Sequence, residues 1–187
     1  MRKLKLQVQM TVDGYMSGPN GEMDWMTFPW TDDLGAYIGA LTAQVDTIVL
    51  GRKLAEGFIP HWASNPESEP QVAIDQMNNT PKVVISNSLA ESLWDNTVVA
   101  GGDLAEIINK LKSQPGGDII VYGGGTLVSN LIAASLIDEL HLFVNPTAIG
   151  AGLPVFGNPG ANKLFSMAAA TPFECGITAL HLEPKRA

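Results

Sequence analysis

Four short runs of mostly β-branched residues, separated by segments with helical spacing, constrain the fold of this chain more than any other feature. The runs are TIVL (47–50), VVI (83–85), TVVA (97–100) and IIVY (119–122). Continuous Val and Ile without polar alternation is typical of strands that are buried on both faces, as in a parallel sheet flanked by helices. The helical segments cover roughly residues 52–58, 70–78, 103–112 and 125–134. The pattern therefore predicts an α/β fold with a mostly parallel sheet.

Both ends of the chain extend this sheet. Residues 3–11 alternate between polar and apolar side chains, which predicts a strand with one well-buried face. After the last helix, the segments 139–145, 163–169 and 177–183 follow one another with only loops between them. This all-β tail predicts antiparallel strands at the C-terminal edge of a mixed sheet. We expect one domain over residues 1–187, because no linker divides a chain of this length.

Composition and charge limit the partners of the protein. The chain has 19 acidic and 11 basic residues, a formal net charge of −8. Such a chain repels phosphate backbones and anionic lipid, so we expect neither a nucleic-acid nor a membrane partner. Cys175 is the single cysteine, no apolar stretch approaches the ~20 residues of a membrane helix, and the N-terminal residues do not resemble a signal peptide. We expect a cytoplasmic protein.

Glycine and small polar residues follow the predicted parallel strands. In an open α/β sheet, ligands bind beyond the carboxyl ends of the strands. Four of the five strand ends carry glycine, and the other carries hydroxyl and amide groups. The five segments are Thr11-Val12-Asp13-Gly14, Gly51-Arg52-Lys53, Ser86-Asn87-Ser88, Ala100-Gly101-Gly102 and Gly123-Gly124-Gly125-Thr126-Leu127. Together they favour close backbone approach to a phosphorylated ligand.

The triple glycine 123–125 lies between a buried strand and a helix that begins near Thr126. The unpaired N–H groups of a helix N-terminus can bind a pyrophosphate without a basic side chain. On this interpretation, Gly124→Val abolishes cofactor binding and leaves a folded protein; the alternative is a tight turn without a ligand. The motif is not GxGxxG, since Val128 takes the place of the third glycine, and no GxxxxGK[ST] exists. A Rossmann domain and a P-loop nucleotidase are disfavoured.

Arg52 and Lys53 supply the cations that a phosphate monoester needs. Following a strand and preceding a helix, they are candidates for binding the 2′-phosphate of NADPH, with Ser86 and Asn87 adding hydrogen bonds. The alternative is a solvated basic start of a helix. Because cations at a helix N-terminus oppose the helix dipole, their presence there favours a ligand.

Acidic and aromatic residues gather in and after the loop 13–26. The loop contains Asp13, Glu22 and Asp24, with Trp25 and Trp30 nearby. A carboxylate beside aromatic rings suits a flat, nitrogen-rich heterocycle, which can stack on a ring and exchange a proton with the acid. The alternative is that each acid only caps a loop. His61, His141 and His181 are isolated in the sequence, so we expect no metal site and interpret the last two as packed strand residues.

The ordered series of these motifs resembles the dihydrofolate-reductase-like superfamily. The segments that carry the resemblance are VDGYMSGPNGEMDW, DTIVLGRK, KVVISNS, IIVYGGGTLVSNLI and DELHLFVNPTAIGAGLPVF. Over residues 1–183 the chain is most similar to the family named for the reductase domain of the bifunctional riboflavin-biosynthesis deaminase–reductase. The resemblance implies a three-layer sandwich, NADPH as hydride donor and often a homodimer. From this habit, the charge-poor composition and the apolar C-terminal strands, we expect a homodimer in which segments 139–145 and 163–183 supply much of the interface.

The resemblance also implies roles for individual residues. The expected cofactor-binding residues are Val12, Gly51, Arg52, Lys53, Ser86, Asn87, Gly123, Gly124, Gly125, Thr126 and Leu127. The candidate catalytic acids are Asp13, Asp24 and Asp33, and Trp25 and Trp30 are expected to contact the substrate. Asp32 and Asp33 are near the position where dihydrofolate reductases carry a carboxylate on the first helix, although the spacing differs.

One departure from the family concerns the substrate. Riboflavin-pathway reductases usually carry arginines after the Trp for the ribose phosphate, whereas residues 26–50 contain no cation. The leading hypothesis is hydride transfer from NADPH to a C=N bond of a pterin- or aminopyrimidine-like ring. One alternative is the phosphorylated ribosylaminopyrimidine of the riboflavin pathway, and another is an NADPH sensor without catalysis.

Overall fold

A computed structural model describes residues 1–157 and 159–185 of the chain. Ten strands occur in these ranges: β1 (Leu4–Thr11), β2 (Tyr15–Ser17), β3 (Val45–Gly51), β4 (Lys82–Ile85), β5 (Thr97–Ala100), β6 (Asp118–Gly123), β7 (Glu139–Asn145), β8 (Leu153–Pro154), β9 (Phe165–Pro172) and β10 (Thr178–Pro184). The helices are α1 (Asp32–Thr42), α2 (Arg52–Ala63), α3 (Gln71–Asn79), α4 (Leu104–Ser113) and α5 (Gly125–Ala133). Within the described ranges, none of these helices has the length and apolar character needed to cross a membrane.

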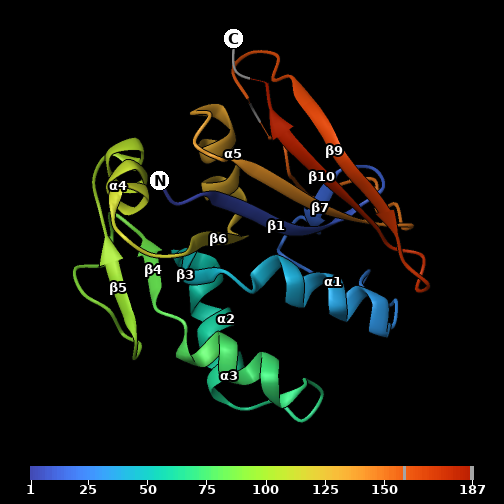
Figure 1. The fold of residues 1–187 in the computed structure, drawn as a ribbon, viewed down its shortest axis with the longest axis horizontal. Helices are drawn as coiled ribbons and strands as arrows, with labels where there is room; N and C mark the ends of the chain where they lie inside the picture. Colours follow the sequence, from blue (N-terminus) through green and yellow to red (C-terminus); the bar gives the residue numbers. More distant parts are fainter. Residues whose placement is uncertain (158, 186–187) are drawn as a thin grey trace.

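Eight of the strands form one mixed sheet in the order β5-β4-β3-β6-β1-β7-β10-β9 (Figure 1). All pairs from β5 to β7 are parallel. The strand β10 pairs antiparallel with both β7 and β9. The mostly parallel sheet with antiparallel C-terminal edge strands is therefore confirmed. The strands β2 and β8 form a separate two-stranded sheet that the sequence pattern did not predict.

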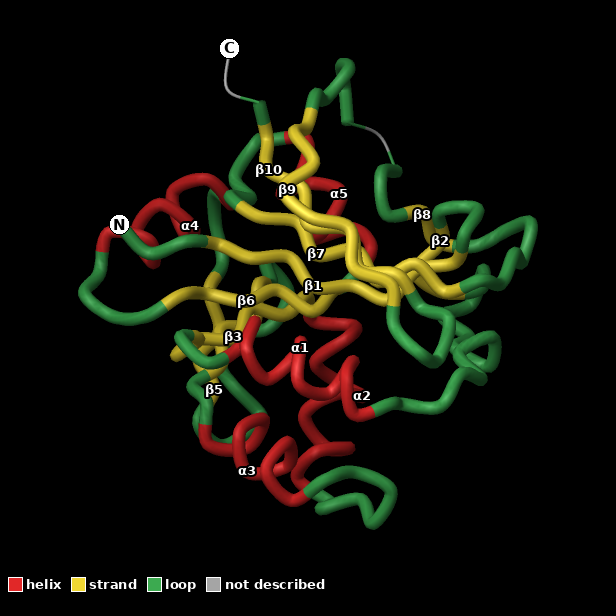
Figure 2. Tube along the Cα trace, turned by 45° about the vertical axis from the view of Figure 1, so that its right-hand side comes forward, coloured by secondary structure: helices red, strands yellow, loops and turns green. Residues whose placement is uncertain are grey.

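Helices cover both faces of the sheet, as a parallel sheet requires. In Figures 1 and 2, α4 and α5 lie on one side, and α1, α2 and α3 lie on the other. On the first side, Leu4 and Leu6 pack in one cluster with Ile108 and Leu131 from the helices. On the second side, one cluster joins α1 to β7 and β10, and another joins α2 to the centre of the sheet. The three-layer sandwich is confirmed.

Two strands differ from their expected burial. The strand β1 has two covered faces rather than one, since Gln7 is only 8% exposed and Thr11 is 0% exposed. The reason is tertiary: β1 lies inside the sheet between β6 and β7, with helical layers on both faces of the sheet. In contrast, β5 was expected to be buried, yet its Val98 is 60% exposed. Among the described residues, β5 is the last strand at that edge of the sheet.

Candidate functional site

The predicted ligand-binding segments lie along one edge of the sheet. Strand register pairs Leu50 with Gly123, Gly51 with Ile85, and Ile85 with Ala100. Since parallel strands end at the same edge, the segments that follow β5, β4, β3 and β6 are neighbours in that order. Because β3 and β4 are neighbours, Arg52, which follows β3, lies beside Ser86, which follows β4. The structure brings the cofactor segments together as the sequence predicted.

The backbones of Gly51 and Gly124 approach each other at the centre of this edge. A Cβ atom built on Gly124 would lie 3.2 Å from the Cα atom of Gly51, which is tighter than ordinary packing. Gly124 has φ +96°, a conformation that side chains disfavour. Glycine at this position is thus required by the turn itself, and a Gly124→Val substitution does not isolate a ligand's need for space. A Cβ on Gly51 would make only ordinary contacts, the nearest at 3.5 Å.

Two helices begin at these glycines. Gly51 is the N-cap of α2 and Gly124 is the N-cap of α5. Neither helix carries an acidic residue in its first turn, so the positive ends of both dipoles remain uncompensated there. Arg52 and Lys53 add two side-chain cations at the start of α2, and Arg52 forms an ion pair with Glu56 one turn along the helix. The edge of this acidic protein is locally suited to an anion.

Ser86 and Asn87 have structural roles at the same edge. The Ser86 hydroxyl accepts hydrogen bonds from the backbone N–H groups of Ser88 and Leu89, both at 3.1 Å. The Asn87 side-chain oxygen accepts a bond from the N–H of Gly102 at 2.7 Å. The Asn87 bond ties the segments after β4 and β5 together, whereas the Ser86 bonds lie within the segment after β4. The Ser86 and Ser88 hydroxyls also share a hydrogen bond of 3.2 Å, and the expected ligand role of Ser86 and Asn87 stays a prediction.

The three candidate acids differ in their surroundings. Asp13 accepts hydrogen bonds from the backbone N–H groups of Ile149 (3.2 Å) and Gly150 (2.8 Å). The Thr11 hydroxyl and these amides hold the pKa of the Asp13 carboxyl below its usual value. Asp33 accepts bonds from the N–H groups of Leu34 (2.8 Å) and Glu174 (2.9 Å), which fasten α1 to the turn between β9 and β10. Asp24 is exposed. A catalytic role for each of them stays a prediction.

The two candidate substrate tryptophans also differ. Trp25 is only 6% exposed, and its indole N–H has no hydrogen-bond partner among the described residues. Trp30 is 57% exposed. In this conformation Trp30 presents a ring that a heterocycle can stack on, whereas Trp25 is largely covered.

Sequence reasoning missed the small sheet of β2 and β8 beside the triple glycine. A Cβ built on Gly125 would lie 3.6 Å from Leu153 and 3.7 Å from Met16, so these apolar side chains border the start of α5. Strands of two and three residues have no readable alternation. The GAG run 150–152 was the available signal, because Gly152 packs so close to Ser17 that a Cβ there would meet the Ser17 carbonyl.

His141 and His181, which are far apart in the sequence, lie on strands as expected and meet in the structure. The rings of His141 and His181 stack with centroids 4.3 Å apart, and the His141 imidazole lies 3.3 Å from the Glu139 carboxylate. Burial and the neighbouring His181 lower the pKa of His141 to about 4, despite the opposing effect of Glu139. Residues 40 positions apart meet because β10 pairs antiparallel with β7, with His181 directly opposite His141.

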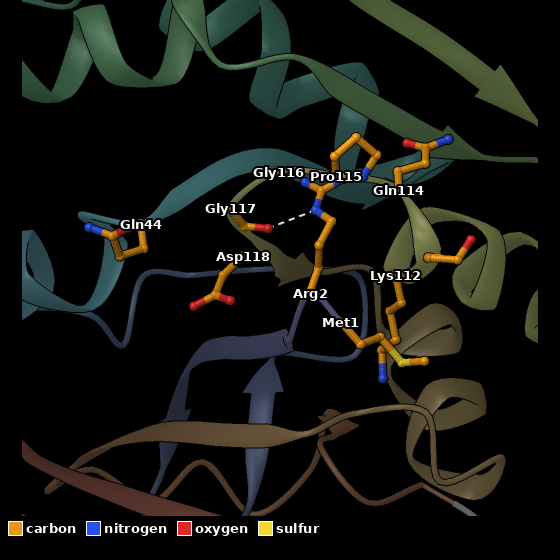
Figure 3. A pocket seen from close by; sticks show the side chains of 10 residues that line it. Met1, Arg2, Gln44, Lys112, Gln114, Pro115, Gly116, Gly117 and Asp118 are labelled. Atoms are coloured by element: carbon orange, nitrogen blue, oxygen red, sulfur yellow. Dashed lines mark hydrogen bonds between the residues drawn. The ribbon is translucent and has the colours of Figure 1, made fainter.

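A surface hollow of about 830 Å³ lies at the opposite edge of the sheet, at the amino ends of β1 and β6. In Figure 3 the Arg2 side chain points toward Gly117, to whose carbonyl it donates a hydrogen bond of 2.7 Å. Arg2 also pairs with Asp46, and Lys112 donates to the Leu136 carbonyl at 2.6 Å. Both cations thus stabilise the fold. The carboxyl edge, rather than this hollow, is the candidate functional site.

A comparison with known families agrees with this arrangement. Residues 2–179 match the family model of the RibD C-terminal domain. The chain belongs to the RibD C-terminal domain family. A relative in Bacillus subtilis (strain 168), the uncharacterized protein YyaP, is 28% identical over 176 residues, which cover 94% of this chain and 92% of YyaP.

Solved structures support the RibD-type fold. A protein from Shewanella sp. PV-4, provisionally assigned to riboflavin biosynthesis, superimposes over the full length of both chains with a TM-score of 0.80 and 23% identity. Dihydrofolate reductase from Enterococcus faecalis, in a complex with NADP(H), gives a TM-score of 0.62 at 16% identity, covering 98% of this chain and 97% of the reductase. The dihydrofolate-reductase-like fold is confirmed.

The glycine turn generates a test of its structural role. Gly124→Ala should lower the free energy of unfolding by about 1–3 kcal/mol, because alanine is strained at this φ and its Cβ presses on Gly51. Gly125→Ala should change it by less than about 1 kcal/mol, because its Cβ would make only ordinary contacts. Urea unfolding of the two variants measures the difference. Equal losses of stability would contradict this account of the turn.

Proposed function

We propose that this protein is an NADPH-dependent reductase that transfers hydride to a C=N bond of a pterin- or aminopyrimidine-like ring. The observation that carries the proposal is the meeting of two helix N-termini at Gly51 and Gly124, with Arg52 and Lys53 beside them. Backbone N–H groups and cations at one sheet edge suit a dinucleotide that carries an additional phosphate.

The described residues include the types of group that bind the phosphates of NADPH. Gly124 and Gly125 at the start of α5 would hold the pyrophosphate through backbone N–H groups, and Arg52, Lys53 and Ser86 would bind the 2′-phosphate. The Enterococcus faecalis reductase with the same fold was solved with NADP(H), which supports this choice of cofactor. When bound, NADPH supplies the hydride that reduces the C=N carbon.

The substrate would lie at the same edge, beyond β1, and stack on Trp30. Reduction of a C=N bond also requires a proton at nitrogen. Asp13 and Asp33 are held by backbone N–H groups that stabilise their carboxylates, which leaves exposed Asp24 or water as the proton source that we favour. Asp13 then acts chiefly by fastening the loop after β1 to residues 149–150.

The first prediction of this proposal concerns cofactor preference. NADPH should bind more tightly than NADH, and Arg52→Ala should weaken NADPH by roughly ten- to a hundredfold, equivalent to about 1.5–3 kcal/mol for a charge-assisted contact. Isothermal titration of both cofactors measures it. Equal affinities for NADPH and NADH in the unsubstituted protein would refute the proposed phosphate contact.

Glu56→Gln is the matched control, because Glu56 competes with the phosphate for Arg52. Breaking an exposed ion pair of this kind should strengthen NADPH binding by roughly two- to fivefold and leave NADH unchanged. Weaker NADPH binding in this variant would mean that Arg52 needs Glu56 for its position.

The second prediction is that the phosphorylated ribosylaminopyrimidine of the riboflavin pathway is a poor substrate. Residues 26–50 offer no cation for its phosphate. Lys163 donates to the Ala133 carbonyl (2.8 Å) and the Ser135 hydroxyl (2.9 Å), so this cation is already engaged. Burial of a phosphate without compensating cations is costly.

NADPH oxidation, followed by absorbance with this compound, its dephosphorylated form and dihydropterins, tests the substrate class. Turnover should favour the uncharged rings. A catalytic efficiency above ~10⁴ M⁻¹s⁻¹ for the phosphorylated compound would overturn the charge argument. Tight NADPH binding without turnover across the panel would favour the sensor instead.

We also propose a homodimer formed through β9. This strand lies at the edge of the sheet. Its Met167 is 55% exposed, and Leu164, the residue directly before the strand, is 69% exposed. Such an apolar edge normally has a partner. The interface does not include β7, which is inside the sheet and mostly buried, although the sequence suggested it.

The dimer predicts a sedimentation mass twice that of the monomer at micromolar concentration. Met167→Lys should shift the mass toward the monomer, because a charge on an edge strand opposes strand association. Val98→Lys, on the exposed edge strand at the other end of the sheet, is the control and should leave the mass unchanged. A monomer mass for the unsubstituted protein would refute the proposal.

A further inference from the structure

Three side chains that can ligate a metal converge on the face of the sheet that carries α1. Glu139 and His141 project from the same face of β7, and His181 lies opposite His141 on β10. The Glu139 Oε2 atom lies 3.3 Å from His141 Nε2 and 3.9 Å from His181 Nε2. One potential ligand atom from each of the three residues falls within 4.8 Å of the others.

We propose that Glu139, His141 and His181 form a binding site for a divalent transition-metal ion of the Zn²⁺ type. Two imidazole nitrogens and one carboxylate oxygen are a ligand set that Zn²⁺ accepts, with a fourth position left for water. Metal–ligand distances of about 2.0–2.2 Å in a tetrahedral site imply ligand–ligand separations of about 3.3–3.5 Å. The Glu139–His141 separation of 3.3 Å already has this value, and His181 Nε2, which lies 3.9 Å from Glu139, would move closer on binding.

An unsatisfied polar atom points to the same ligand. His181 Nε2 is buried and has no hydrogen-bond partner among the described residues. Buried polar atoms normally have a hydrogen-bond or metal partner, so we expect a ligand between this nitrogen and the Glu139 carboxylate. A bound cation would satisfy it, whereas the carboxylate at 3.9 Å is beyond hydrogen-bonding distance.

The surrounding groups leave the ligand atoms available. The Tyr37 hydroxyl lies 3.4 Å from His141 Nδ1 and can accept a hydrogen bond from its N–H, which leaves the unprotonated Nε2 to face the ion. Lys3 pairs with the other oxygen of Glu139, Oε1. Lys5 lies 4.0 Å from Oε2 but 2.8 Å from Asp118, so its charge is largely balanced by that carboxylate.

The site links β7 to β10, and its ion would cross-link the antiparallel part of the sheet. It lies at the amino end of β7, where Glu139 pairs with Lys5, away from the carboxyl-edge glycines, so we assign it no part in the proposed hydride transfer. Because an ion that binds only the folded state stabilises that state, Zn²⁺ should raise the melting temperature. This inference does not depend on the proposed reductase activity.

Zn²⁺ titration of chelator-treated protein by calorimetry tests the site, and Co²⁺ absorption reports its geometry. We expect one equivalent to bind, a tetrahedral Co²⁺ spectrum and a higher melting temperature. His181→Ala should abolish all three responses, whereas His61→Ala, which removes an exposed histidine on α2, should retain them. Absence of one-equivalent binding, or its retention in His181→Ala, would overturn the proposal.

Tyr37→Phe keeps the test decisive if His181→Ala fails to fold. Removing the hydroxyl that orients His141 should weaken Zn²⁺ binding by about 10- to 100-fold, as is usual for outer-sphere partners of a metal ligand, while circular dichroism remains unchanged. Unaltered Zn²⁺ affinity in a folded Tyr37→Phe protein would count against His141 as a ligand.

Discussion

The close contact between the backbones of Gly51 and Gly124 sets the geometry on which the candidate site depends. The strands β3 and β6 pair in parallel up to Leu50 and Gly123, and beyond that point the chain departs into α2 and α5. These two helices cover opposite faces of the sheet, and their N-termini meet at its carboxyl edge. Any side chain at Gly124 would push the two turns apart. One steric constraint thus shapes both the helical layers and the edge that we propose as the cofactor site.

Positive charge gathers at this edge, although the protein as a whole is acidic. The net charge is −8, yet two helix N-termini and two cations meet at the carboxyl ends of β3 and β6. Nearby acids are held by other groups: Asp13 binds backbone amides of residues 149–150, and Glu56 pairs with Arg52. A local positive field within an acidic surface favours a phosphorylated cofactor over extended polyanions.

The antiparallel part of the sheet has a different character. On the side of the sheet that α1 covers, β1 and β7 contribute Lys5, Gln7, Glu139 and His141, which form a largely buried polar region. Hydrogen bonds and ion pairs satisfy much of this region, whereas Gln7 Oε1 and His181 Nε2 have no hydrogen-bond partner among the described residues. Buried polar groups of this kind impose specific pairing, since each requires a particular neighbour. The register of β7 and β10 is therefore coupled to the chemistry of the proposed metal site.

The periodicity of the sequence determined the order and type of the main elements. The predicted strand 139–145 coincides with β7, and the glycine junctions follow their strands as predicted. Both could be predicted because the hydrophobic pattern of a segment reflects the burial of that segment. Tertiary structure alone decided the burial of Gln7, the exposure of Val98, the small β2–β8 sheet and the meeting of Glu139 with two histidines. These features depend on which strands become neighbours and in what register, and pairing between residues such as His141 and His181 leaves no periodic mark in either segment.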